Sequence, residues 1–166
     1  MGSGGSFIFY LRPRSDGEAW DRIVLEDNSH DRVGPELSPD GRYVAYESAE
    51  SGRPEVYVRP FPHGDWKKQI STNGGGKPRW QRKEKIFYVE ADTLMVVPVS
   101  AAREFAPGAP ERLFHEEGLF NGRGQTYDVT SDGQRIVVVE GRQTPWPGEI
   151  QVVQNWHEEL RDREGE

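Results

Sequence analysis

The sequence predicts an all-β fold, a β-propeller of about four blades of antiparallel strands, two of them incomplete, followed by a short C-terminal helix. Two observations carry this prediction. A tight-turn motif between two short apolar strands recurs along the chain at intervals of about 40–50 residues, the length of a propeller blade. The 166 residues also include 19 glycines and 12 prolines, which favours many short elements joined by turns.

The motif is clearest at Ser38-Pro39-Asp40-Gly41. Proline presets φ at the second position of a type I turn, aspartate suits the third, and glycine accepts the left-handed conformation of the bulge that follows. The flanking residues 36–37 and 42–46 are therefore predicted to be the two arms of a hairpin.

Two later stretches repeat this hairpin, residues 78–88 and residues 127–138. Tyr46 and Tyr88 lie 42 residues apart, and Asp40 and Asp132 lie 92 apart, which is two periods of 46. One blade cannot cover both of its own faces, so repeats of this length are expected to stack around an axis. The third unit has Gln81-Arg82-Lys83-Glu84 in place of the Asp-Gly turn, so its hairpin must close differently.

Further strands are predicted from β-propensity and alternation, at residues 7–11, 19–25, 55–59, 66–70, 94–99, 112–114 and 150–153. The predicted strand numbers are three, four, four and three, because the first unit lacks its innermost strand and the last its outermost. The partial propeller spans residues 7–160, with blades at about 7–32, 33–72, 76–114 and 125–156. Residues 156–163 are predicted to form the short helix, and 157–166 form a charged tail.

Composition limits the function classes. The net charge of −7 argues against a general nucleic-acid surface, which requires clustered lysine and arginine. No apolar run is long enough to span a bilayer, and no signal peptide is recognised; residues 1–6 resemble an added glycine-serine leader that would replace any native targeting segment. Apolar residues make up 34% of the chain, which predicts strands with one buried and one solvated face.

No catalytic, metal or cofactor site is predicted. The turn aspartates Asp16, Asp40 and Asp132 are interpreted as turn caps, and they belong to separate blades. The four histidines have no metal-ligand spacing, and the absence of cysteine excludes thiolate ligands. The chain has no Gly-x-Ser-x-Gly nucleophile motif, and its glycine-rich loops 73–77 and 121–124 do not match a phosphate-binding loop.

The repeat resembles the TolB-like, WD40-like (PD40) propeller repeat, in which a Ser-Pro-Asp-Gly turn precedes a strand of the form seen at residues 42–48. The resemblance covers nearly everything from 7 to 160. Residues 51–62, 69–75 and 153–160 are also similar to phrases in the C-terminal propeller segments of bacterial serine/threonine kinases. By resemblance, the chain is expected to be a non-catalytic interaction module, and a sensor portion of such a kinase outside the cytoplasm.

Rings of this family usually need six or more blades, more than this chain supplies. The open alternatives are a four-bladed ring, an incomplete propeller, or half of a ring completed by a second copy. An open end would expose strand edges and apolar faces, which favours the homodimer. The expected partners are a second copy and a protein or peptide ligand, without nucleic acid and without membrane insertion of this segment.

Large side chains in the loops between and within blades are candidate contacts for the ligand, because tryptophan, phenylalanine and arginine contribute strongly to interfaces. These candidates are Arg53, Phe120, Arg123 and Trp146. Trp20, Trp66 and Trp80 lie on predicted strands and are expected to pack between blades. Two other functions stay open: a propeller that gates a prolyl-oligopeptidase-like hydrolase domain absent from this sequence, and an excised or engineered propeller piece.

Overall fold

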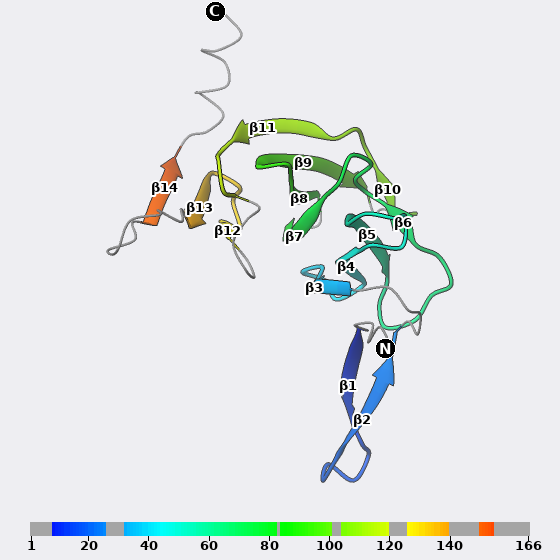
Figure 1. Ribbon diagram of the computed structural model, residues 1–166. Coiled ribbons are helices and arrows are strands. Elements are labelled where there is room, and N and C mark those ends of the chain that lie inside the picture. Colours follow the sequence, from blue (N-terminus) through cyan, green and yellow to red (C-terminus); the bar gives the residue numbers. More distant parts are fainter. Residues whose placement is uncertain are drawn as a thin grey trace, which may run out of the picture.

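A computed structural model of the chain describes residues 8–25, 32–82, 84–100, 104–119, 126–139 and 150–154. Every regular element among them is a strand, and all strand pairs are antiparallel. The strands form four sheets that follow one another along the chain and stand side by side in an arc (Figure 1). Consecutive antiparallel meanders stacked in this way are the blades of a β-propeller.

The strand bounds follow the chain sheet by sheet. The first sheet pairs β1 (Phe9–Pro13) with β2 (Trp20–Val24). The second contains β3 (Arg32–Leu37), β4 (Tyr43–Ser48), β5 (Glu55–Pro60) and β6 (Lys68–Gln69). The third contains β7 (Gly76–Gln81), β8 (Lys85–Glu90), β9 (Thr93–Ser100), β10 (Ala106–Pro107) and β11 (Glu111–His115). The fourth contains β12 (Tyr127–Val129), β13 (Arg135–Val139) and β14 (Ile150–Gln154).

The predicted turn motif forms the β3–β4 hairpin. The Gly41 N–H donates to the Ser38 carbonyl at 2.8 Å, and Gly41 has a φ of 67° in the left-handed region. The Ser38 hydroxyl accepts hydrogen bonds from the backbone N–H groups of Arg42 and Tyr43. The same glycine bond closes the turns at residues 14–17 and 130–133, so the motif specifies the hairpin in three sheets.

The core lies between neighbouring sheets, because alternate residues of each middle strand point to opposite neighbours. Val44 and Tyr46 of β4 pack towards the first sheet, whereas Tyr43 and Ala45 pack towards the third. Each of these side chains is at most 7% exposed. The expectation of one solvated face per strand is therefore wrong for the middle strands: β4 and β8 are buried on both faces. The low apolar fraction reflects polar loops and outer strands instead.

One other strand prediction needs correction, because β10 is a short strand that the sequence did not indicate. The β10 strand forms because residues 106–107 return along the end of β9, and Phe105 beside them enters the core between the second and third sheets. The structure describes two strands of the first unit, and the third predicted strand does not fall within the described residues. The predicted blade limits stay predictions.

The structure gives different environments to the three tryptophans that were predicted to lie on strands, and Trp66 lies just before β6. Trp80 is 8% exposed in the core between the second and third sheets, and Trp66 packs against the same core. The expectation of packing between blades is wrong for Trp20, which is 61% exposed because no neighbouring sheet covers its side of the β1–β2 hairpin. The predicted C-terminal helix lies outside the described residues. In the part of the chain that the structure describes, no helix has the length and apolarity needed to span a membrane.

The aromatic centre of the core generates a stability prediction. Phe105 is 1% exposed, and its ring lies 5.1 Å from Tyr43 and 5.7 Å from Trp66 between ring centroids. Phe105→Ala is expected to lower the free energy of unfolding by about 3–5 kcal/mol, because the two sheets cannot close the cavity that remains. Urea denaturation followed by tryptophan fluorescence measures this change. Leu37→Ala, at a side chain 48% exposed, is the control and should cost less than about 1 kcal/mol; equal losses for both variants would contradict the interpretation.

Candidate functional site

The innermost strands of three sheets meet on the concave side of the arc, where β3, β7 and β12 lie next to one another (Figure 1). This side carries charged residues among otherwise apolar blades. Five of them form the group called here the inner-strand cluster. Four of its members lie on the innermost strands, and the fifth lies on the neighbouring strand β4: Glu36 of β3, Lys77 and Arg79 of β7, Asp128 of β12, and Glu47 of β4.

Arg79 connects three sheets. From β7 its guanidinium forms an ion pair with the Glu36 carboxylate of β3, and its Nε lies 3.8 Å from the Asp128 carboxylate of β12. Glu36 also accepts the Trp80 backbone N–H at 3.2 Å, and its carbonyl oxygen accepts the indole N–H of Trp80 at 3.1 Å. Two of the charges are mostly covered, with side chains 18% exposed for Glu36 and 29% for Arg79, while Asp128 is 75% exposed.

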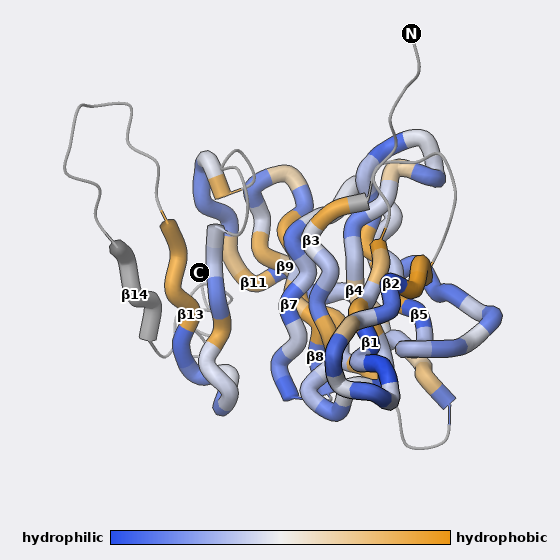
Figure 2. Tube along the Cα trace, turned by 90° about the horizontal axis from the view of Figure 1, so that it is seen from below, coloured by the Kyte–Doolittle hydropathy of each residue, from blue (hydrophilic) through white to orange (hydrophobic). Residues whose placement is uncertain are grey.

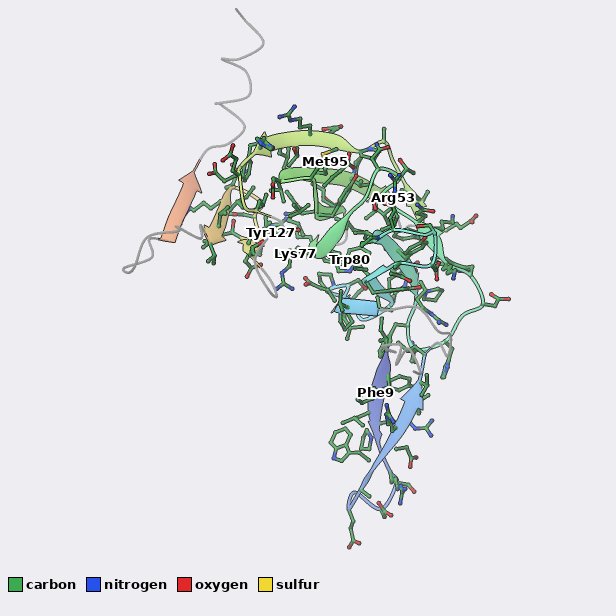
Figure 3. All side chains as sticks on the ribbon, viewed as in Figure 1. Phe9, Arg53, Lys77, Trp80, Met95 and Tyr127 are labelled. Atoms are coloured by element: carbon green, nitrogen blue, oxygen red, sulfur yellow. The ribbon has the colours of Figure 1, made fainter. Side chains whose placement is uncertain are left out.

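Lys77 occupies the beginning of β7, on the same inner side as Tyr127 (Figure 3). Its ammonium group lies 3.3 Å from the Thr126 hydroxyl and 3.4 Å from the Leu119 carbonyl oxygen. Its carbonyl oxygen accepts the Tyr127 hydroxyl at 2.7 Å. The backbone φ of Lys77 is 55°, in the left-handed region, and the pairing of β7 with β8 shifts register between Gly76 and Arg79.

Burial works against both charges of the Glu47–Lys77 pair. Desolvation raises the pKa of Glu47, and it does so despite the opposing hydrogen bond from the Lys77 backbone and the positive charge of Lys77. Desolvation likewise lowers the pKa of Lys77, against the attraction of Glu47 and Asp92. Burial also raises the pKa of Tyr127, so its phenol stays a neutral hydrogen-bond donor.

The structure places Arg53, one of the four predicted ligand contacts, in a local network. Its Nε donates to Glu55 at 2.8 Å, and a terminal nitrogen donates to the Thr72 carbonyl oxygen. Arg53 lies on the outer part of the second blade, away from Lys77 (Figure 3). The other three candidates, Phe120, Arg123 and Trp146, lie outside the described residues, so no geometry brings the four together.

The turn aspartates act as caps, as predicted. Asp40 accepts the Ser38 hydroxyl at 2.7 Å and the Arg42 N–H at 3.2 Å, and Asp16 accepts the Glu18 N–H at 3.0 Å. Asp132 accepts the Thr130 hydroxyl and the Gln134 N–H, and chiefly the first bond lowers its pKa. Among the described residues, no group of three or more histidine, aspartate or glutamate side chains is placed to hold a metal ion.

The sequence interpretation missed the inner-strand cluster. Glu36, Arg79 and Asp128 nevertheless occupy one position of the repeat, directly after Pro35, Pro78 and Tyr127. The charge at this position alternates in sign from one unit to the next, and this pattern could have indicated the ion pairs between blades. Glu47 and Lys77 offered no such signal, because their approach depends on how two blades stack.

The inner-strand cluster contains both carboxylates and cations, and Asp128 is the most exposed of the three members that form ion pairs. Such an arrangement suits hydrogen bonding and ion pairing with a polar chain.

Strand order and stacking define this chain as a β-propeller protein, and its repeat is TolB-like. Two curated relatives are similar to part of this chain: the Tol-Pal system protein TolB of Shigella flexneri is 34% identical over 62 residues, and TolB of Escherichia fergusonii is 33% identical over 69. These matches cover 37% and 42% of this chain, and 14% and 16% of the relatives. The chain therefore matches only about one-sixth or less of the length of either relative.

A solved structure, TolB from Acinetobacter baumannii, has a TM-score of 0.39 and 15% sequence identity to this chain. The alignment covers 89% of this chain and 46% of that protein. The fold assignment rests on the strand order rather than on this superposition. No family model matches the chain.

The raised pKa of Glu47 generates a prediction about pH. A carboxyl whose folded pKa lies above its unfolded value stabilises the fold when protonated, and this contribution is lost as pH rises through the folded pKa. Wild type is therefore expected to lose stability relative to Glu47→Gln as pH rises above about 4.5, the ordinary glutamate pKa, because glutamine stays uncharged. Urea midpoints of both proteins across that rise measure the difference. Glu104→Gln, at a carboxylate 83% exposed, is the control; identical curves for the two variants would refute the assignment.

Proposed function

We propose that this chain is a non-catalytic propeller module that binds a protein or peptide segment and associates with a second copy of itself. The observation that carries the binding role is the inner-strand cluster, where charges from three blades gather on the concave side and Asp128 stays 75% exposed. A peptide offers both N–H and C=O groups and charged ends, which match a surface with carboxylates and cations side by side.

The TolB-like repeat supports a binding rather than a catalytic role, since the matched relatives are named as members of the Tol-Pal system. The same resemblance supports an extracytoplasmic location. The similarity of residues 51–62 to kinase-associated propeller segments supports a place in the sensor portion of a bacterial kinase. The matches cover only 14% and 16% of the relatives, so the binding role, the location and the kinase context are proposals for this chain.

Arg53, Phe120, Arg123 and Trp146 remain proposed ligand contacts of the surrounding loops. For Arg53 the structure favours a second role, because its bonds to Glu55 and Thr72 tie the loop before β5 to the loop before β7. An arginine held in this way is preorganised, so it can contact a ligand without losing further side-chain entropy.

Peptide selection tests the binding role. A random 12-residue peptide library displayed on phage is selected against the immobilised wild-type chain, and enriched peptides are synthesised and titrated by calorimetry. Asp128→Asn is expected to weaken binding of a selected peptide at least about tenfold, the effect of losing a charge-assisted hydrogen bond. The exposed position of Asp128 means that this variant should keep its thermal stability.

Glu111→Gln is the matched control, because Glu111 is an exposed carboxylate on β11, at the outer edge of the third blade. It should bind the selected peptide as wild type does. Failure to enrich any peptide, or equal loss of binding in both variants, would refute a binding role for the inner-strand cluster.

A further inference from the structure

Asparagine and aspartate residues that directly precede glycine share a chemical weakness. The backbone nitrogen of the glycine can attack the side-chain Cγ of the preceding residue, because glycine has no side chain to hinder the approach. The attack requires that the glycine N–H lose its proton, so the hydrogen-bond acceptor of this N–H influences the rate. The described residues contain four such pairs: Asp16-Gly17, Asp40-Gly41, Asn73-Gly74 and Asp132-Gly133.

In the three aspartate pairs, the backbone of the turn holds the glycine N–H. It donates to the carbonyl oxygen three residues earlier, at 3.0 Å for Gly17 and at 2.8 Å for both Gly41 and Gly133. These bonds close the hairpin turns, so they persist as long as each hairpin is formed.

The Asn73-Gly74 pair is held by a side chain instead. It lies in the connection between β6 and β7, residues 70–75, called here the 70–75 link. The Gly74 N–H donates to the Glu55 carboxylate of β5 at 2.9 Å. Glu55 is 1% exposed, and it also accepts hydrogen bonds from Arg53 and Ser71. Asn73 itself is exposed to solvent.

The negative charge of this acceptor opposes the reaction at Asn73. Loss of the Gly74 proton would place an amide anion 2.9 Å from a carboxylate, and two like charges so close disfavour ionisation. Because Glu55 is buried, water screens this repulsion less than it would at the surface. The hydrogen bond also fixes the Gly74 nitrogen in the link, away from free rotation towards the Asn73 side chain.

We propose that Asn73 is a deamidation site, and that the Glu55 carboxylate protects it while the 70–75 link is in place. When the link opens locally, the Gly74 nitrogen bonds to Asn73 Cγ and the Cγ–Nδ2 bond breaks. The amide group leaves with the Gly74 proton as ammonia, and a cyclic imide remains. Water then opens the imide at either carbonyl, which gives aspartate or isoaspartate. This inference does not depend on the proposed binding function.

The isoaspartate product does not fit the original path of the link. Its main chain runs through the former side-chain carbons and is one carbon longer. Beside it, an added Cβ on Gly75 would lie 2.5 Å from the Ser71 hydroxyl oxygen and 3.1 Å from Cδ2 of Tyr88. The Gly75 N–H also donates to the Pro54 carbonyl oxygen at 2.9 Å. Deamidation therefore makes the opening of the link permanent at the start of β7.

Peptide mapping by mass spectrometry tests the protection, during incubation at neutral pH and physiological temperature. The reference is a synthetic peptide of residues 69–79. Asn73 of the folded wild type is expected to deamidate at least about tenfold more slowly than Asn73 of the peptide, the effect of a hydrogen bond to a charged group. Glu55→Gln should recover most of this difference, because a neutral acceptor does not repel the amide anion.

Gly75→Ala is a second variant that keeps the carboxylate and displaces the link through the short contact with Ser71. It should also accelerate deamidation, and it decides the test if Glu55→Gln does not fold. Glu104→Gln, at a carboxylate 83% exposed, should keep the wild-type rate.

Ile136→Val separates local protection from overall stability. Ile136 lies on β13, the hydrophobic strand near one end of the array (Figure 2), in the core shared by the third and fourth sheets. This variant lowers stability without touching the 70–75 link, so Asn73 should react at the wild-type rate. An acceleration equal to that of Glu55→Gln would show that overall folding alone protects Asn73, and it would overturn the proposal.

Two other rates overturn it as well: deamidation of the wild type as fast as that of the peptide, and wild-type rates in both folded link variants. The permanent opening is tested with Asn73→Asp, which carries the new charge on a main chain of normal length. Isoaspartate-containing wild type, separated by ion exchange, should have a lower urea midpoint than Asn73→Asp. Equal midpoints would show that the longer main chain does not hold the link open.

Discussion

The need to cover both faces of every sheet determines this structure. Ile86 and Tyr88 of β8 enter the core shared with the second sheet, Phe87 and Val89 enter the core shared with the fourth, and all four are at most 1% exposed. A strand with this pattern is stable only between two other sheets, because exposing either face would return two large side chains to water. Stacking of blades is therefore the source of stability, and individual blades depend on their neighbours.

Hydrogen bonds to a buried carboxylate position the segment that connects the second blade to the third. Glu55 is 1% exposed, and its carboxylate accepts hydrogen bonds from Arg53, Ser71 and the Gly74 N–H. The link between blades passes so close to this network that a Cβ on Gly75 would lie 2.5 Å from the Ser71 hydroxyl oxygen. A buried carboxylate is tolerated here because its oxygens are bonded on several sides, and the bonds fix the direction in which the chain enters β7.

The parts of the fold that sequence could predict are those determined within a few residues. The turn at residues 38–41 and its equivalents depend on proline, aspartate and glycine at adjacent positions, so they were predicted correctly. The exposure of Trp20, the path of residues 105–107 and the charges around Lys77 depend on contacts between segments about one blade apart. Such contacts follow from the stacking angle of blades, which no local pattern encodes.

Assembly and binding are coupled through β7. Lys77 and Arg79 each connect an acidic residue of the second sheet to polar groups of the fourth, so the inner-strand cluster exists only when three blades stack at the correct angle. A single blade carries one sign of charge at this position of the repeat, and the alternation arises from the stack. An assembly that holds the blades more firmly would also hold these charges at fixed spacing, which lowers the entropic cost of binding a ligand. Firm stacking of the second, third and fourth sheets is thus expected to hold the charges on the concave side in a fixed arrangement.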